Sequence, residues 1–215
     1  MIKNNLKIIS WPILFGIGQF FMFLIIEIIY SFFANIDHFN SFIVNHAYII
    51  GILNLIIFLP ILKKAYKKEE INYQEKIKHP YKIIILAVIL AMILNTLLYL
   101  IKIKLNVDME FNTNIFVLIN TVIIGPILEE YLFRGIVYNK YLKLYGQKKA
   151  LYITTIIFAI MHGNILSIIY TFIMGFIINK IYIKEKNIKA PILYHITINL
   201  IASLIFPLIC VNLTP

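Results

Sequence analysis

Residues 82–101 read KIIILAVILAMILNTLLYLI, a run that carries no charge after its first residue. About 20 such residues cross the hydrocarbon core of a bilayer as a helix, because a helix satisfies its own backbone hydrogen bonds. Six further segments meet or approach this length: 11–34, 42–62, 115–139, 150–162, 165–180 and 190–211. The sequence therefore predicts an all-α, polytopic transmembrane bundle of about seven spans. The segment 150–162 is too short to cross alone and is a candidate half-span.

The composition agrees with this fold class and excludes others. Of the 215 residues, 61% are hydrophobic and 14% are charged, against about 45–50% and about 25% in soluble domains. The single cysteine, Cys210, excludes an internal disulfide and a metal cluster built on cysteines. Because neither a soluble domain nor an interdomain linker is apparent, we expect residues 1–215 to form one membrane domain.

The lysines indicate the side of the membrane on which each connection lies. Of the lysines, 17 fall in alternate connections, namely the N-terminus and the stretches 63–82, 140–149 and 180–189. Cytoplasmic connections carry an excess of basic residues, so we predict a cytoplasmic N-terminus and a protein embedded in the lipid bilayer. The same distribution argues against nucleic acid as a partner, because the net charge of +10 is spread between spans rather than gathered in one groove.

Three charges interrupt the fourth span, in the stretch GPILEEYLFRG at residues 125–135. A charge at this depth costs about 2.5–3.5 kcal/mol on insertion scales, so Glu129, Glu130 and Arg134 should be paired, hydrated or functional. Glu130 and Arg134 are four residues apart and share a helix face, which predicts an ion pair. Glu129 has no partner nearby in the sequence and is a candidate general base. The alternative is a structural cluster of charges that ties helices together.

Two histidines lie in apolar segments and extend this set. His162 follows Phe158 by four residues, and His195 precedes Asn199 by four, so His195 and Asn199 project from one helix face. An intramembrane histidine is most often a structural hydrogen-bonding group. Here, however, three helices together supply an acid, two imidazoles and an amide, which can activate water and stabilise an oxyanion.

The ordered motifs resemble those of an intramembrane endopeptidase family, the CPBP family. It contains the type II CAAX prenyl proteases and the bacterial bacteriocin-processing and self-immunity proteins. Its pattern is Glu-Glu-x-x-x-Arg, then Phe-x-x-x-His, then His-x-x-x-Asn, which here occupy residues 129–134, 158–162 and 195–199. The resemblance covers roughly 120–200 and implies a catalytic core within 115–211, whereas 1–110 match only as generic spans.

The resemblance implies roles for the motif residues. Glu129 and His162 would activate the water, and His195 and Asn199 would stabilise the tetrahedral intermediate. The predicted ion pair would hold the site or orient the substrate. The resemblance leaves the cofactor open between none and Zn²⁺, with Glu129, His162 and His195 as the zinc ligands, and we favour a site without metal.

The predicted function is hydrolysis of a peptide bond near the cytoplasmic membrane face. The Ile-, Lys- and Asn-rich composition suggests a multi-pass protein of a prokaryotic plasma membrane, so the expected substrate is a peptide or a membrane protein rather than a prenylated one. A role in bacteriocin self-immunity is compatible with this activity. Two alternatives are a non-catalytic immunity or scaffold protein and a proton-coupled transporter. Glu27, in the first span, matches no motif and is expected to be structural or to face a cavity.

Overall fold

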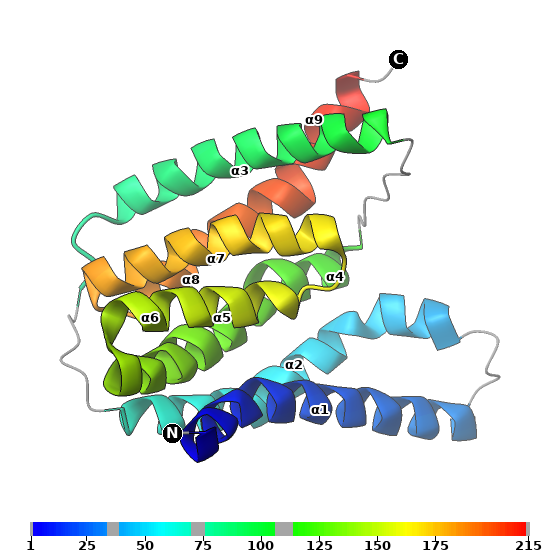
Figure 1. The fold of residues 1–215 in the computed structure, drawn as a ribbon. Helices are drawn as coiled ribbons and strands as arrows, with labels where there is room; N and C mark the ends of the chain where they lie inside the picture. Colours follow the sequence, from blue (N-terminus) through cyan, green and yellow to red (C-terminus); the bar gives the residue numbers. More distant parts are fainter. Residues whose placement is uncertain (1, 34–38, 70–75, 106–113, 214–215) are drawn as a thin grey trace.

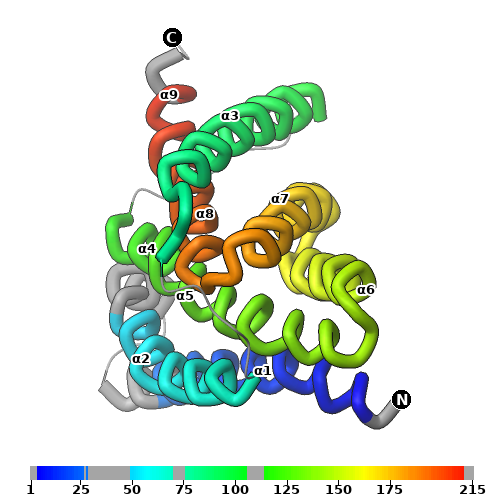
Figure 2. The backbone as a smooth tube through the Cα atoms, turned by 90° about the vertical axis from the view of Figure 1, so that its left-hand side faces the viewer, coloured from blue at the N-terminus to red at the C-terminus, as the bar shows by residue number. Residues whose placement is uncertain are grey.

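The computed structural model describes residues 2–33, 39–69, 76–105 and 114–213, and all regular elements in these ranges are helical (Figures 1 and 2). The first three helices are α1 (Ile2–Phe33), α2 (Phe39–Lys67) and α3 (Pro80–Lys104). A composite helix follows, formed by α4 (Ile115–Ile119), η2 (Asn120–Ile124), α5 (Gly125–Glu130), η3 (Tyr131–Tyr138) and the start of α6 (Asn139–Ile160). The chain ends with α7 (Ile165–Glu185), α8 (Lys189–Leu200), η4 (Ile201–Ile205) and α9 (Phe206–Leu213). The η segments are π-helical.

Six helical stretches in the described ranges are long and apolar enough to cross a membrane. They are Asn4–Ile26, Ile49–Lys67, Pro80–Lys104, Ile115–Ile160, Ile165–Glu185 and Lys189–Cys210. The fourth stretch turns at Gly146, whose φ of 76° and ψ of 170° are not helical and suit a residue without a Cβ. Its two arms contain the predicted segments 115–139 and 150–162. The predicted fold class is confirmed, the span count holds approximately, and the protein is a multi-pass integral membrane protein.

The helices extend beyond the apolar runs that predicted them. α2 continues from residue 62 to Lys67, and α3 continues from residue 101 to Lys104. Lysine favours the helical conformation, and its long aliphatic stem covers apolar surface while the ammonium group reaches water. The ends of the apolar runs therefore mark the edge of the hydrocarbon and not the ends of the helices.

The lysine-rich connections gather at one end of the bundle. Figure 1 shows the end of α2, the start of α3, the turn at Gly146 and the link from α7 to α8 on the left, with the link from α6 to α7 and the C-terminus on the right. The N-terminus lies toward the left as well. Lysine-rich and lysine-poor connections therefore lie at opposite ends of the bundle, as the charge pattern predicts. The assignment of the lysine-rich end to the cytoplasm stays a prediction.

Two asparagines begin helices that carry the site. Asn114 Oδ1 accepts the backbone N–H groups of Phe116 at 2.9 Å and Val117 at 3.4 Å, which caps α4. Asn164 Oδ1 accepts the N–H of Ser167 at 3.0 Å and caps α7. Gly163, with φ of 88°, reverses the chain immediately before that cap. These local signals fix where the two helices enter the bundle.

The helices that surround the site pack tightly, whereas the outer helices present apolar side chains outward. Ala87 and Ala91 of α3 are fully buried beside Ile178 and Ile198 of α7 and α8. Small residues allow such helices to approach closely. Many large aliphatic side chains of α1, α2 and α3 are exposed, as expected of surfaces that face lipid. The side chain of Glu27 lies outside those that the structure describes.

Candidate active site

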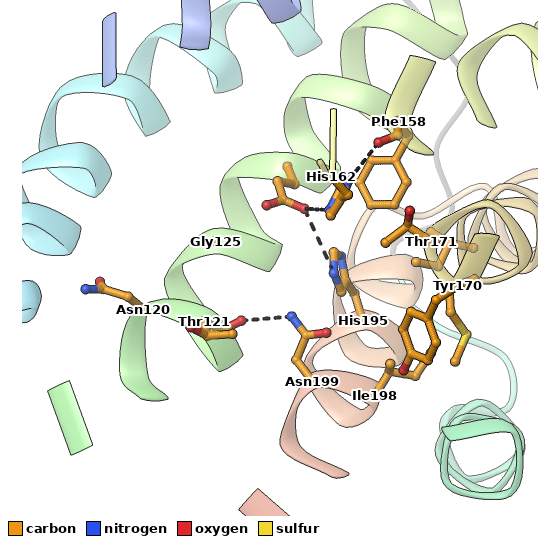
Figure 3. Close-up of a pocket in the computed structure, with 13 residues that line it drawn as sticks. Asn120, Thr121, Gly125, Phe158, His162, Tyr170, Thr171, His195, Ile198 and Asn199 are labelled. Atoms are coloured by element: carbon orange, nitrogen blue, oxygen red, sulfur yellow. Dashed lines mark hydrogen bonds and ion pairs between the residues drawn. The ribbon is translucent and has the colours of Figure 1, made fainter. Parts of the chain in front are cut away.

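The two glutamates of the first motif lie in α5, a single short α-helical segment between two π-helical ones. Figure 3 shows the cavity that this helix faces. π-turns are rare and occur frequently at functional sites. Arg134 lies in η3, so the Glu-Glu-x-x-x-Arg motif begins in an α-helical segment and ends in a π-helical one. No feature of the sequence predicted these turns.

The predicted ion pair between Glu130 and Arg134 is present and fully buried. Arg134 Nη1 lies 3.0 Å from Glu130 Oε1, and both side chains have no exposed surface. Arg134 Nε donates to Asn179 Oδ1 at 3.2 Å, and its Nη2 donates to the carbonyl of Gly175 at 3.1 Å. The guanidinium also lies 4.5 Å from the centroid of the Phe158 ring. Arg134 therefore links its own helix to α6 and α7.

Glu129, which lacks a partner nearby in the sequence, meets both intramembrane histidines in space. Its Oε2 lies 3.9 Å from His162 Nε2 and 3.9 Å from His195 Nε2. The Glu129 side chain is 30% exposed, in contrast to the closed environment of Glu130. The two neighbouring carboxylates thus have different surroundings: one is sealed in an ion pair and the other borders a cavity.

The second nitrogen of each histidine is held by a fixed acceptor. His162 Nδ1 lies 2.7 Å from the carbonyl oxygen of Phe158, and because a carbonyl can only accept, Nδ1 carries the proton. His195 Nδ1 lies 2.8 Å from Glu130 Oε1, the same oxygen that binds Arg134. Both rings therefore direct Nε2 toward Glu129. In a neutral His162 this Nε2 is a hydrogen-bond acceptor.

The amide of Asn199 completes the site by binding the backbone of the neighbouring helix. Its Nδ2 donates to the carbonyl of Thr121 at 2.8 Å (Figure 3). The N–H of Gly125 bonds to the carbonyl of Asn120 in the π-helical pattern, so the matching donor for Thr121 would be residue 126. That residue is Pro126, which has no N–H. Asn199 supplies the missing donor and keeps a second N–H of its own.

All four predicted catalytic residues line one cavity of about 450 Å³. Figure 3 shows His162, His195 and Asn199 around it together with side chains of α7. The α7 side chains that line the cavity are Tyr170, Thr171, Met174 and Ile178. Tyr170 accepts a hydrogen bond of 3.3 Å from Asn95 Nδ2, which connects this wall to α3.

The sequence did not single out the α7 residues or Asn179. Residues 165–180 read as one apolar span, and no charge or spacing separates the cavity wall from the lipid-facing side. Asn179 did carry a signal, since a buried amide within a span usually binds another helix.

The three side chains expected as zinc ligands, Glu129, His162 and His195, lie together in the cavity. Zinc is bound at about 2.0–2.2 Å by nitrogen and oxygen ligands. Among the described side chains, no group of three His, Cys, Asp or Glu residues is arranged to hold a metal ion.

Asn179 provides a first test of how the site is held. Its Nδ2 donates to Thr155 Oγ1 at 2.9 Å, and its Oδ1 accepts from Arg134. We expect Asn179→Leu to lower the free energy of unfolding by about 1–3 kcal/mol, because Arg134 and Thr155 lose buried partners. Denaturation of the purified protein in mixed micelles measures this change. Gln147→Leu removes an exposed amide as the matched control, and equal stability of both variants would contradict the expectation.

Comparison with protein families gives the site its context. Residues 111–201 match the family model described as type II CAAX prenyl endopeptidase, Rce1-like, and this segment contains all three motifs. Over these residues the chain is similar to the CAAX endopeptidase family. Within the CAAX endopeptidase match, Glu129 and Glu130 lie on the composite helix, His162 follows α6, and His195 and Asn199 lie on α8. The family match supports the resemblance first seen in the motifs.

A relative among curated proteins agrees with this similarity. The protein described as "Putative membrane peptidase YdiL", from Bacillus subtilis (strain 168), is 34% identical over 77 residues. The alignment covers 36% of this chain and 32% of that relative, so it spans about a third of each. No solved structure matches the chain significantly.

Proposed function

We propose that this protein is an intramembrane endopeptidase in which Glu129 and His162 activate the attacking water. The observation that carries the proposal is the convergence of Glu129, His162, His195 and Asn199 on one cavity within the bundle. The match of residues 111–201 to the CAAX endopeptidase family model supports the same reaction class. Three separate helical segments supply these groups, an arrangement that a purely structural charge cluster does not require.

The first step is proton transfer to Glu129. A water molecule between Glu129 Oε2 and His162 Nε2 would find an acceptor for each of its protons, since these atoms are 3.9 Å apart. Glu129 accepts one proton while the water oxygen forms a bond to the peptide carbonyl carbon. The electron pair of the C=O π bond moves to the oxygen and forms a tetrahedral oxyanion.

His195 and Asn199 are the groups proposed to stabilise that oxyanion. His195 Nδ1 contacts Glu130 Oε1, so Nε2 is the ring nitrogen that faces the cavity. Donation to the oxyanion from Nε2 requires a proton on that nitrogen while the intermediate exists. The second N–H of Asn199 is a further donor, because Thr121 occupies only the first. Such preorganised donors are a large term in catalysis.

Collapse of the intermediate returns the proton. The C–O double bond forms again, the C–N bond breaks, and Glu129 gives its proton to the departing amine. The products are a carboxylic acid and an amine, so one water molecule is consumed and Glu129 is restored. Glu130 and Arg134 take no part in the bond changes and act as positioning residues for His195.

The cavity wall points to an apolar peptide segment as the substrate. Met174, Ile178 and Ile198 present apolar surface beside the polar groups, which suits a peptide or membrane-protein segment taken from the bilayer. For the prokaryotic plasma membrane expected from the composition, leader peptides and pheromone precursors are the proposed substrates, and bacteriocin self-immunity is a compatible outcome.

Comparative mass spectrometry tests the proposal. Membrane and secreted peptides are compared between cells that produce the wild-type protein and cells that produce Glu129→Gln at the same level. We expect a set of peptides whose new termini require the wild-type protein. Identical peptide profiles would count against proteolysis, and proton-coupled uptake into vesicles would instead favour a transporter.

Removal of metal tests the cofactor proposal separately. Because the carboxylate and the two imidazoles do not form a ligand set as they stand, we expect peptide hydrolysis to persist after dialysis against a chelator. Elemental analysis of the active protein should find zinc well below one equivalent. Loss of activity on chelation, with recovery on addition of Zn²⁺, would instead assign the three side chains to a metal.

A further inference from the structure

A second cavity lies at the lysine-rich end of the bundle, between α1, α2 and α6. Its volume is about 340 Å³, and none of its residues belongs to the three motifs. Its charged lining residues are Lys7, Lys68, Glu69, Lys140 and Lys143. Apolar contact is available from Ile8 and Leu144. The cavity therefore combines a charged cradle with an apolar wall.

A buried carboxylate organises half of this cradle. Glu69 has a relative exposure of only 4%, and its two oxygens bind different lysines. Oε1 lies 2.9 Å from Lys140 Nζ, and Oε2 lies 3.0 Å from Lys143 Nζ. An ammonium group has three donors, so each of these lysines keeps donors for another acceptor. Glu69 thus fixes the positions of two ammonium groups and leaves hydrogen-bond donors available on each.

The cradle carries more positive charge than it can balance internally. Four lysines and one glutamate give it a net charge of +3, and Lys7 and Lys68 are exposed at its rim. Bringing four ammonium groups together is unfavourable unless an anion joins them. A ligand with several oxygen acceptors and at least one negative charge would satisfy the remaining donors.

We propose that this cavity binds the phosphate headgroup of an anionic phospholipid. The chemistry that it recognises is a phosphate oxyanion, and its position favours a lipid as the source of that phosphate. The lysines lie outside the apolar runs 11–34, 42–62 and 115–139, where we expect the lipid headgroups. Leu144, which is 41% exposed in the same lining, provides a surface for the glycerol and first acyl carbons. The proposal does not depend on proteolytic activity.

The chain contains a natural reporter for this site. Trp11 is its only tryptophan, and it follows Lys7 by one helical turn in α1. Bromine on a lipid acyl chain quenches tryptophan fluorescence at short range. Purified full-length protein in detergent micelles is titrated with brominated phosphatidylglycerol and, separately, with brominated phosphatidylcholine. We expect phosphatidylglycerol to quench Trp11 at a much lower mole fraction.

Matched double variants separate the site from general charge effects. Each surface lysine contributes about 1 kcal/mol to the binding of anionic lipid, so Lys7→Ala with Lys68→Ala should weaken the apparent affinity for phosphatidylglycerol by about 30-fold. Lys102→Ala with Lys104→Ala removes the same charge from the last turn of α3 and should change it by less than about 3-fold. Replacement of Lys7 and Lys68 by arginine should preserve binding.

Three outcomes would overturn the proposal. Equal quenching by the two lipids would show that no anion site lies near Trp11. Equal loss in both alanine pairs would show that overall charge, and not this cavity, attracts the lipid. Displacement of brominated phosphatidylglycerol by millimolar inorganic phosphate would assign the cavity to a soluble phosphate compound instead. Circular dichroism confirms that each variant is folded before it is titrated.

Discussion

Replacement of Glu129 by glutamine is expected to lower kcat for peptide hydrolysis by about 10²–10⁴-fold, the usual contribution of a general base. Glutamine preserves the shape of the side chain and its contact distance to His162 and His195, but it cannot accept the proton from water. KM should change little, because the apolar wall of the cavity is untouched. The rate is measured on a peptide identified by the cellular comparison, with protein reconstituted in lipid vesicles.

Glu27→Gln is the matched control for this experiment. It makes the same substitution within another span, outside the three motifs, and it should retain activity within about 3-fold of wild type because Glu27 corresponds to no motif residue. Thermal denaturation shows whether either variant has lost its fold. A Glu129→Gln protein that is folded and as fast as the control would exclude Glu129 as the base, and another group would have to receive the proton.

Replacement of Arg134 by methionine is expected to cause the largest loss of stability. It leaves Glu130 as a fully buried carboxylate without its cation, and breaking a buried pair in this way costs about 3–5 kcal/mol. The carbonyl of Gly175 and the amide of Asn179 lose a donor in the same change. Unfolding in mixed micelles measures the loss as a decrease in the free energy of unfolding.

The double variant Glu130→Gln with Arg134→Met distinguishes charge from packing. Removal of both charges eliminates the unpaired carboxylate, so the double variant should recover much of the stability that Arg134→Met loses. If the double variant is as unstable as the single one, the contacts of the guanidinium with Phe158 and Asn179 determine stability, and the ion pair does not. The side-chain oxygen of the glutamine at position 130 can still accept the hydrogen bond from His195, so this contact is retained in the double variant. The comparison measures stability and does not depend on activity.

The sequence predicted the fold well because a bilayer imposes a minimum apolar length on each span. The run at residues 82–101 became α3, with its ends displaced to Pro80 and Lys104. The displacement arises because hydropathy reports where the hydrocarbon ends, whereas the helix continues into water through lysines. The turn at Gly146 was expected only as a charged connection, since a positive φ leaves no hydropathy signal.

The site was partly predictable for a related reason. A spacing of four residues determines which side chains share a helix face, and this was sufficient for Glu130 with Arg134 and for His195 with Asn199. The meeting of Glu129 with His162 was implied only by the family resemblance, because contacts between helices leave no local pattern. Tyr170 and Thr171 were missed since both sides of α7 are apolar in sequence.

The hydrogen bond from the Asn199 amide to the Thr121 carbonyl couples two spans. Through it, the helical pitch of the fourth span helps to determine where the Asn199 side chain lies on α8. Pro126 has no backbone N–H to donate to Thr121. Asn199 of α8 donates to that carbonyl instead. A ligand or substitution that converts the stretch from Asn120 to Ile124 into regular α-helix would let the N–H of Gly125 bond to the carbonyl of Thr121. The Asn199 amide would then be released. The winding of the fourth span and the position of Asn199, the proposed oxyanion donor, are therefore mechanically coupled.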